Sequence, residues 1–347
     1  MSTVLTAFFY ILIMVLVFGV LIFIHEFGHF ITARFCKVTV NEFAIGMGPK
    51  IFSKQGKKHN TKYTLRALPI GGFVSMEGED NASEDRNAFC NKSIWQRMLI
   101  VVTGPVMNLL LGFILMTVLV FSQEAIGSTT IGQFTDTAVS NQKLQVNDVV
   151  VQVEKTKVHT WNELAYEIMN QGYKPIDIVV ERNGERITLE DVSFPTFEDT
   201  GAVFGDCDFI PFAEAKSFPN LVKHAYFRSL STIKMVYDSL GGLFSGRFGM
   251  EAVSGPVGVT EVVGNAAKSG LSNFIYIIAV LTMNLGVFNL IPFPALDGGR
   301  FLLLAIEGII GRPLNKNIEG YINFVGIIIL FGFMIVVTCK DILKLIF

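Results

Sequence analysis

The sequence lacks a disulfide framework and a marked net charge. Its four cysteines are scattered over 347 residues without paired spacing, so we interpret them as free thiols, not as a disulfide scaffold or a cysteine metal site. The formal net charge is only −2, which gives no reason to expect nucleic acid as a partner.

The N-terminus lacks the charged stretch and the small-residue cleavage site of a secretory signal peptide, so its first apolar run is predicted to be a retained membrane span. Internal repeats of the kind that many transporters carry are missing as well. What is abundant is apolar residues, at 51% of the chain. This composition predicts a polytopic membrane protein with some soluble structure.

Four apolar stretches are long enough to cross a bilayer as helices. The segment between the first two, residues 34–97, holds eleven Lys and Arg, and the positive-inside rule places it in the cytoplasm. Both termini and residues 123–270 would then lie outside the cytoplasm. The predicted spans are Val4–Ile24, Met98–Ser122, Ser272–Leu296 and Tyr321–Cys339.

The first apolar run ends in His25-Glu26-Phe27-Gly28-His29. On a helix, His25 and His29 are one turn apart and point the same way, so they can hold one zinc ion. Glu26 beside them is a candidate general base for hydrolysis. This motif also arises by chance, but ionisable groups are costly in a membrane helix and usually mark function. If the helix ended at Ile24, they would lie at the membrane surface.

A third ligand is expected near the end of the third span. Pro292 and Pro294 break the helix there, and Gly298 and Gly299 permit a sharp turn around Asp297. A hydrolytic zinc site needs three protein ligands and one open position, and Asp297 would lie at the same depth as the two histidines. The alternative is an ordinary turn or capping aspartate, because Asp-Gly is a common turn pair.

Residues 43–49 and 63–74 are apolar, rich in Gly and β-formers, and too short to cross the bilayer. They are predicted to be strands, either of a re-entrant hairpin beside the metal or of a plain amphipathic surface hairpin. An unpaired edge strand there could bind an extended substrate segment. In the second span, Asn108 places an amide in the hydrocarbon region, where it either joins helices or faces the catalytic cavity.

From about Gly127 to Pro195 the character of the chain becomes soluble. Short alternating runs surround one amphipathic helix, Trp161–Asn170, and Asn183-Gly184 marks a hairpin, so a small α+β module is predicted. After it, residues 218–244 are expected to form an amphipathic helix. This helix would lie at the outer membrane surface or pack on the module itself.

Together these residues resemble the site-2 protease family of intramembrane zinc metalloproteases, most closely its bacterial, RseP-like branch. The resemblance covers nearly the whole chain, and the order and spacing of its motifs make it specific. The motifs are His25–His29, Gly104-Pro-Val-Met-Asn108, a single PDZ-like module over about 127–195, Ser254–Gly258 and Asn289–Gly299. The segment Lys143–Asp148 departs from the Gly-Leu-x-x-Gly-Asp pattern of such modules.

The resemblance implies that His25, His29 and Asp297 bind Zn²⁺ and that Glu26 is the catalytic base. Substrates would be single-span membrane proteins, such as anti-sigma factors or signal-peptide remnants, first trimmed by a site-1-type protease. The PDZ-like module would act outside the cytoplasm as a filter for trimmed substrates. The residues expected near the substrate are Asn108, Asn289, Gly71 and Gly72.

The expected fold class is a polytopic α-helical membrane protein with four transmembrane helices, a membrane-associated β-hairpin or sheet, and an inserted α+β PDZ-like domain. It would lie in the cell membrane, with its active site toward the cytoplasm. A non-enzymatic zinc-binding scaffold or metal transporter is the alternative, and a membrane-anchored protease for soluble substrates is a third. The expected segments are 1–122 (two spans and the β-region), 123–215 (module), 216–270 (surface helix and linker) and 271–347 (two spans).

Overall fold

A computed structural model describes residues 3–57, 60–79, 81 and 83–346 of the chain. Lys58, one of the eleven basic residues counted above, lies outside these described residues. The chain forms two compact units. One unit combines Met1–Gly112 with Ser254–Phe347, and the other is Phe113–Val253.

Among the described residues, four helices are long and apolar enough to cross a membrane, as predicted. The histidine motif lies inside the first of them, because that helix continues to Phe35 and does not end at Ile24. The third ends at Leu290, earlier than predicted, because Pro292 and Pro294 cannot donate the backbone hydrogen bonds that would extend it. The four helices are α1 (Thr3–Phe35), α2 (Ile94–Ser122), α6 (Leu271–Leu290) and α8 (Lys316–Ile346).

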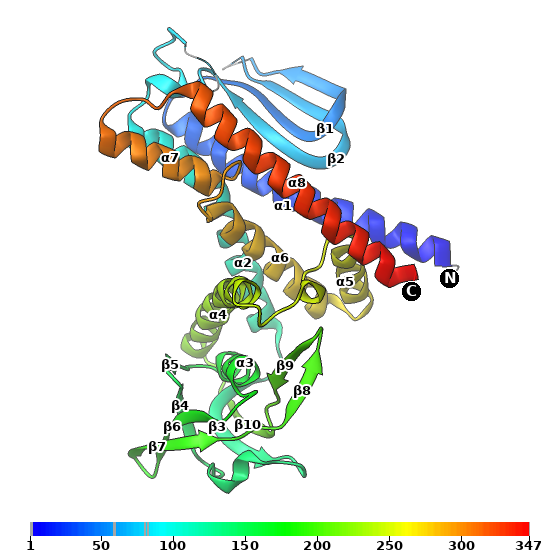
Figure 1. Ribbon diagram of the computed structural model, residues 1–347, viewed down its shortest axis with the longest axis vertical. Helices are drawn as coiled ribbons and strands as arrows, with labels where there is room; N and C mark the ends of the chain where they lie inside the picture. The colour runs from blue at the N-terminus through cyan, green and yellow to red at the C-terminus, as the bar shows by residue number, and fades with distance from the viewer. Residues whose placement is uncertain (1–2, 58–59, 80, 82, 347) are drawn as a thin grey trace. The chain divides into compact units, whose positions relative to one another are not determined.

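Two shorter helices of the first unit were not predicted. The helix α5 (Pro256–Lys268) packs against α1 and α6, and α7 (Asp297–Ile310) follows the turn after α6 (Figure 1). The sequence suggested that Asp297 is held on irregular backbone at a sharp turn. Asp297 is instead the first residue of a helix. The apolar run after Gly299 is too short to cross a bilayer, so it was not predicted to be a membrane span. No separate helix was predicted there either.

A small sheet of β1 (Val40–Gln55) and β2 (Lys62–Met76) packs on α1 (Figure 1). The first half of β1 pairs with the end of β2, where Ile45 lies opposite Gly72. The second half of β1 pairs with the start of β2, where Lys54 lies opposite Tyr63. The two long strands therefore fold back on one another. In the described part of the chain, residues 72–76 form one edge of this sheet and residues 52–55 the other.

The second unit is an α+β structure built on a six-stranded sheet of order β10-β3-β4-β6-β7, with β5 on β4. Its buried core is aliphatic and aromatic and includes Ile131, Leu164 and Ile178. A separate hairpin joins β8 (Thr196–Asp199) to β9 (Ala202–Gly205). The sheet strands are β3 (Ile126–Phe134), β4 (Val149–Val153), β5 (Thr156–Lys157), β6 (Ile176–Arg182), β7 (Glu185–Val192) and β10 (Phe209–Glu214).

Two α-helices lie wholly within the described part of this unit, α3 (Trp161–Gln171) and α4 (Phe218–Phe244), and both agree with the predicted amphipathic helices. They pack against each other. Lys234 of α4 forms an ion pair with Glu167 of α3 at 2.9 Å, and Asp238 accepts a 2.8 Å hydrogen bond from Tyr166. The alternative that α4 packs on the module is thus confirmed, while its contact with the membrane and the PDZ-like nature of the unit stay predictions.

Candidate metal centre

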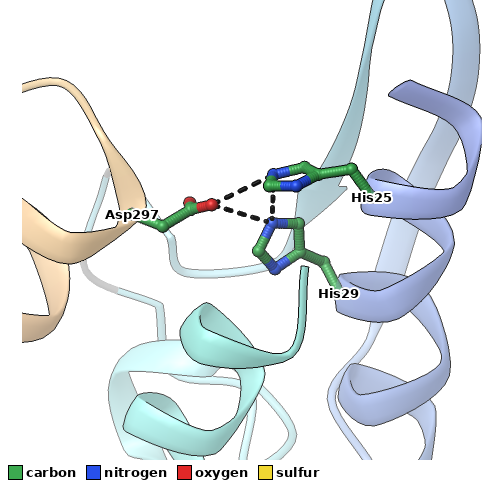
Figure 2. Close-up of side chains that lie close together, drawn as sticks. All are labelled: His25, His29 and Asp297. Atoms are coloured by element: carbon green, nitrogen blue, oxygen red, sulfur yellow. Dashed lines mark hydrogen bonds and ion pairs between the residues drawn. The ribbon is translucent and has the colours of Figure 1, made fainter. Parts of the chain in front are cut away.

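His25, His29 and Asp297 meet at one point of the first unit (Figure 2). The Oδ2 atom of Asp297 lies 3.0 Å from Nε2 of His25 and 3.5 Å from Nε2 of His29. The two Nε2 atoms lie 3.2 Å apart. Two side chains from α1 and one from the start of α7 thus direct one ligand atom each toward a common position, although they are far apart in the sequence.

The outer nitrogen of each imidazole contacts α2, and these contacts orient the rings. Nδ1 of His29 lies 2.8 Å from the carbonyl oxygen of Ile100 and donates to it, which leaves the Nε2 lone pair directed inward. Nδ1 of His25 lies 3.3 Å from the amide of Asn108, whose side chain is fully buried. Asn108 is held in turn because its backbone carbonyl accepts a hydrogen bond from Thr282.

Glycines allow α1 and α2 to approach this closely. A Cβ atom at Gly104 would lie 2.2 Å from Nε2 of His29, and a Cβ atom at Gly28 would lie 2.6 Å from the carbonyl oxygen of Thr103. Only glycine fits at either position without a shift of backbone or ligand. The space that Gly104 leaves for the His29 ring was not foreseen from the sequence.

The turn between α6 and α7 places Asp297. A Cβ atom at Gly298 or Gly299 would come within 2.3 Å of a carbonyl oxygen of the preceding turn, so the chain can double back only with glycine there. Ala295 adopts a φ of 72°, and its N–H donates to the side chain of Asn323 on α8 at 3.2 Å. These contacts fix the loop on both sides of the carboxylate.

The donor set fits a zinc ion. Oδ2 of Asp297 is buried and has no hydrogen-bond partner among the described residues, as expected of an atom that ligates a metal. Atoms bonded at ~2.0–2.1 Å to one tetrahedral ion lie roughly 3.3 Å apart, and the three measured separations fall on either side of that value. Three protein ligands leave one position open, which is typical of catalytic zinc sites.

The charge of Asp297 also suits a cation. Burial alone would raise the pKa of this carboxyl group, but the two adjacent imidazoles outweigh burial and hold the pKa below its usual range. The group is therefore an anion, as a carboxylate that ligates a metal must be.

Glu26 lies next to the edge of the small sheet. A Cβ atom at Gly72 would lie 3.2 Å from Cγ of Glu26 and 3.0 Å from the carbonyl oxygen of Ala44, so glycine permits this approach. Gly71 before it has a φ of 84°, a conformation that favours glycine. Asn289 is in the last turn of α6, and its side chain forms no hydrogen bond within the described residues.

A polar cavity of about 400 Å³ lies beside Asp297 and was not foreseen from the sequence. Arg300 of α7 forms an ion pair there with Glu79, which follows β2, and its guanidinium lies 4.9 Å from the Phe89 ring. The cavity gives water a polar approach to the carboxylate. No sequence signal linked Arg300 to Glu79, because their contact depends on the tertiary fold.

Comparison with known proteins agrees with this geometry. The model of peptidase family M50 matches residues 13–333. A Clostridium acetobutylicum protein classed with the zinc metalloproteases is 37% identical over 340 residues, which cover 97% of this chain and 98% of that protein. Zinc metalloprotease RasP of Shouchella clausii is 30% identical over 416 aligned residues, covering 95% and 97% of the two chains.

The regulator of sigma-W protease RasP of Bacillus subtilis is 28% identical over 414 aligned residues, which cover 95% of this chain and 97% of that protein. These relatives decide for an enzyme over the non-enzymatic scaffold or metal transporter. The chain belongs to peptidase family M50, the site-2 proteases, and is a multi-pass membrane zinc metalloendopeptidase.

Proposed function

We propose that His25, His29 and Asp297 hold the zinc ion and that Glu26 is the general base for hydrolysis of a peptide bond in a membrane-spanning substrate. The observation that carries this proposal is the convergence of three ligand atoms within 4.8 Å of one another. Glu26 directly follows the ligand His25 in the sequence. When bound, zinc would polarise the scissile carbonyl and make water more acidic.

The chain's own residues would supply the rest of the chemistry. The Glu26 carboxylate accepts the proton of the attacking water and returns it to the leaving amine. The contact of His29 with Ile100 keeps its ring in the ligating tautomer, and Asn108 would do the same for His25 once its amide is turned so that Oδ1 faces Nδ1. Full burial of Asn108 supports a role through His25, so any effect on the substrate is indirect.

The edge strand at residues 72–76 would bind the substrate. A membrane helix hides its carbonyl groups in hydrogen bonds and must unwind locally before attack. An extended segment can then add to the free edge of β2, and Gly71 and Gly72 leave room for it beside Glu26. Asn289 would hold the other side of that segment.

Residues 34–97 would face the cytoplasm, and both termini and the second unit would lie outside. The substrates would be single-span proteins, such as anti-sigma factors or signal-peptide remnants. The PDZ-like unit would admit them only after a site-1-type protease has removed their outer domain. The eleven basic residues in 34–97 and the α+β fold of the second unit support this arrangement.

The test uses Glu26→Gln in the full chain, reconstituted with a single-span reporter protein. We expect cleavage to fall by at least about 10²-fold, because an amide cannot accept the proton. Zinc content measured by elemental analysis should stay at the wild-type level, because Glu26 is not a ligand. Glu261→Gln, an exposed change on α5, serves as the control and should cleave normally. Undiminished cleavage by Glu26→Gln would contradict the proposal.

A further inference from the structure

An apolar cavity of about 450 Å³ lies between α1 and the β1–β2 sheet. Its volume is within the range of roughly 300–1,000 Å³ that small-ligand sites occupy. We call it the aromatic slot, because aromatic rings dominate its walls. Those of α1 are Phe23, Phe27 and Phe30, and those of the sheet are Phe43, Phe52 and Tyr63.

The aromatic slot is separate from the metal centre. The three phenylalanines of α1 follow one another at i, i+4 and i+7 and so form one stripe along the helix. At 3.6 residues per turn, Phe27 is about 200° around the helix from His25. The slot and the zinc ligands therefore lie on different sides of α1, and no residue of the metal centre lines the slot.

The outer wall of the slot is open. Phe52 is 59% exposed and Leu65, opposite it in the sheet, is 45% exposed. Ile51 and Met47 of the same strand are exposed apolar residues as well, but they do not line the slot. In a chain whose described residues include four helices long and apolar enough to cross a membrane, such a surface is expected to face hydrocarbon and not water.

Two cations lie beside this apolar surface. Lys54 is opposite Tyr63 in the sheet, so its side chain emerges on the same face as the slot, and no carboxylate lies within 4 Å of it among the described residues. The guanidinium of Arg34 lies 5.4 Å from the Phe30 ring and donates to Thr61. An apolar slot with cations at its rim matches an acyl chain that ends in a negatively charged head group.

We infer that the aromatic slot binds one acyl chain of an anionic phospholipid, with Lys54 and Arg34 at the phosphate. The lipid would fill the space between α1 and the outer edge of the sheet and so brace the strands that lead to Gly72. A zwitterionic lipid offers the same chain but no net charge for the two cations. A substrate peptide is the competing occupant of the slot, and the experiment distinguishes a bound lipid from a bound peptide.

The experiment places a fluorescent reporter in the slot of the full-length protein with Phe52→Trp. The two native tryptophans, Trp95 and Trp161, are first replaced by phenylalanine, so that they do not contribute. The protein is incorporated into phosphatidylcholine nanodiscs that contain a minor fraction of a brominated lipid, which quenches tryptophan on contact. Ile51→Trp is the matched control, because Ile51 is the neighbouring, equally apolar and exposed position and does not line the slot.

We expect brominated phosphatidylglycerol to quench the Phe52→Trp reporter with about 30-fold higher apparent affinity than brominated phosphatidylcholine, as two basic contacts predict. The Ile51→Trp reporter should show no such preference. Lys54→Gln should lower the preference to about fivefold, because Arg34 remains, and Lys50→Gln, opposite Arg66 on the other face, should keep it in full. Leu65→Trp provides a second reporter in the slot if Phe52→Trp folds poorly.

Equal quenching of the Phe52→Trp reporter by both lipids would overturn the inference, as would the same preference at Ile51. If a single-span substrate peptide relieves the quenching at Phe52, the slot belongs to the substrate and the lipid assignment is wrong. The assay does not depend on catalysis. It can be run with Glu26→Gln, so its result is independent of the proposed proteolytic mechanism.

Discussion

The ligating atoms of His25 and His29 are aligned by what their second nitrogens contact. His29 donates to a backbone carbonyl, which fixes its tautomer without help from another side chain. His25 depends on Asn108, whose Oδ1 is buried and without a partner among the described residues. If the amide turns by 180°, Oδ1 accepts the Nδ1–H hydrogen bond and Nε2 of His25 is left free for the metal.

This arrangement predicts that Asn108→Leu, which keeps the side-chain volume but removes the acceptor, weakens zinc binding about 10- to 100-fold. Asn108→Asp keeps an oxygen at the same place and should retain most of the affinity. Competition with a chromophoric zinc chelator measures both, and the exposed Asn273→Leu is the control. Equal affinity of Asn108→Leu and wild type would show that the contact with His25 has no role in ligation.

The residues of the metal centre were largely predictable, because their signals are local. Two histidines one turn apart, a glutamate between them and a proline-flanked Asp-Gly pair each mark chemistry within a few positions. The close approach of Gly104 to His29 was not predictable, because it depends on how α2 lies against α1. The same holds for the ion pair of Arg300 with Glu79, since either residue alone has the pattern of an ordinary surface charge.

Among the elements, those with a strong period or a marked boundary were predicted well. The helix α4 has the predicted bounds, and the short alternating runs predicted around α3 include the strand β4 (Val149–Val153). The helices α5 and α7 were missed. Both lie next to long apolar spans in the sequence. At α7, the boundary between the span and the short helix is a glycine turn after Pro294, and this turn has no helical periodicity that would indicate where a new helix begins.

The Ser254-Gly-Pro-Val-Gly258 motif acquires a structural role at the start of α5. Oδ2 of Asp341, on α8, accepts hydrogen bonds from the backbone N–H groups of Gly255 and Gly258, both at 2.9 Å. A Cβ atom at Gly255 would lie 2.9 Å from that oxygen. The buried carboxylate of Asp341 on the membrane helix α8 thus satisfies free N–H groups at the beginning of the short helix α5.

Asp341→Ala should therefore destabilise the protein by about 1–3 kcal/mol, because it leaves two N–H groups without an acceptor in a buried place. Thermal unfolding in detergent, followed by intrinsic fluorescence, would show a lower midpoint. Asp341→Asn keeps one acceptor oxygen and should lose less. If both variants unfold at the wild-type temperature, the contact between α5 and α8 does not contribute to stability.

For the whole molecule, a zinc ion at the proposed site would be a crosslink between parts of the chain that are distant in sequence. It would join α1 to the start of α7 within the unit Met1–Gly112 and Ser254–Phe347. The described part of Phe113–Val253 holds no comparable group of metal-ligating side chains. The two units should thus respond differently when the metal is removed, although they belong to one chain.

A ligand that binds only the folded state stabilises it by RT ln(1 + [L]/Kd), which is about 4 kcal/mol when the free metal is at 1,000 times its Kd. Chelation should therefore increase amide hydrogen exchange around His25, His29 and Asp297, measured by mass spectrometry, and leave the β4–β6 core of the second unit unchanged. Asp297→Asn removes the charged ligand and should exchange like the chelated wild type, with little further response to chelator. A chelator effect spread evenly over both units would contradict a single metal site that joins α1 to α7, because the free energy of ligation belongs to the elements that hold the ligands.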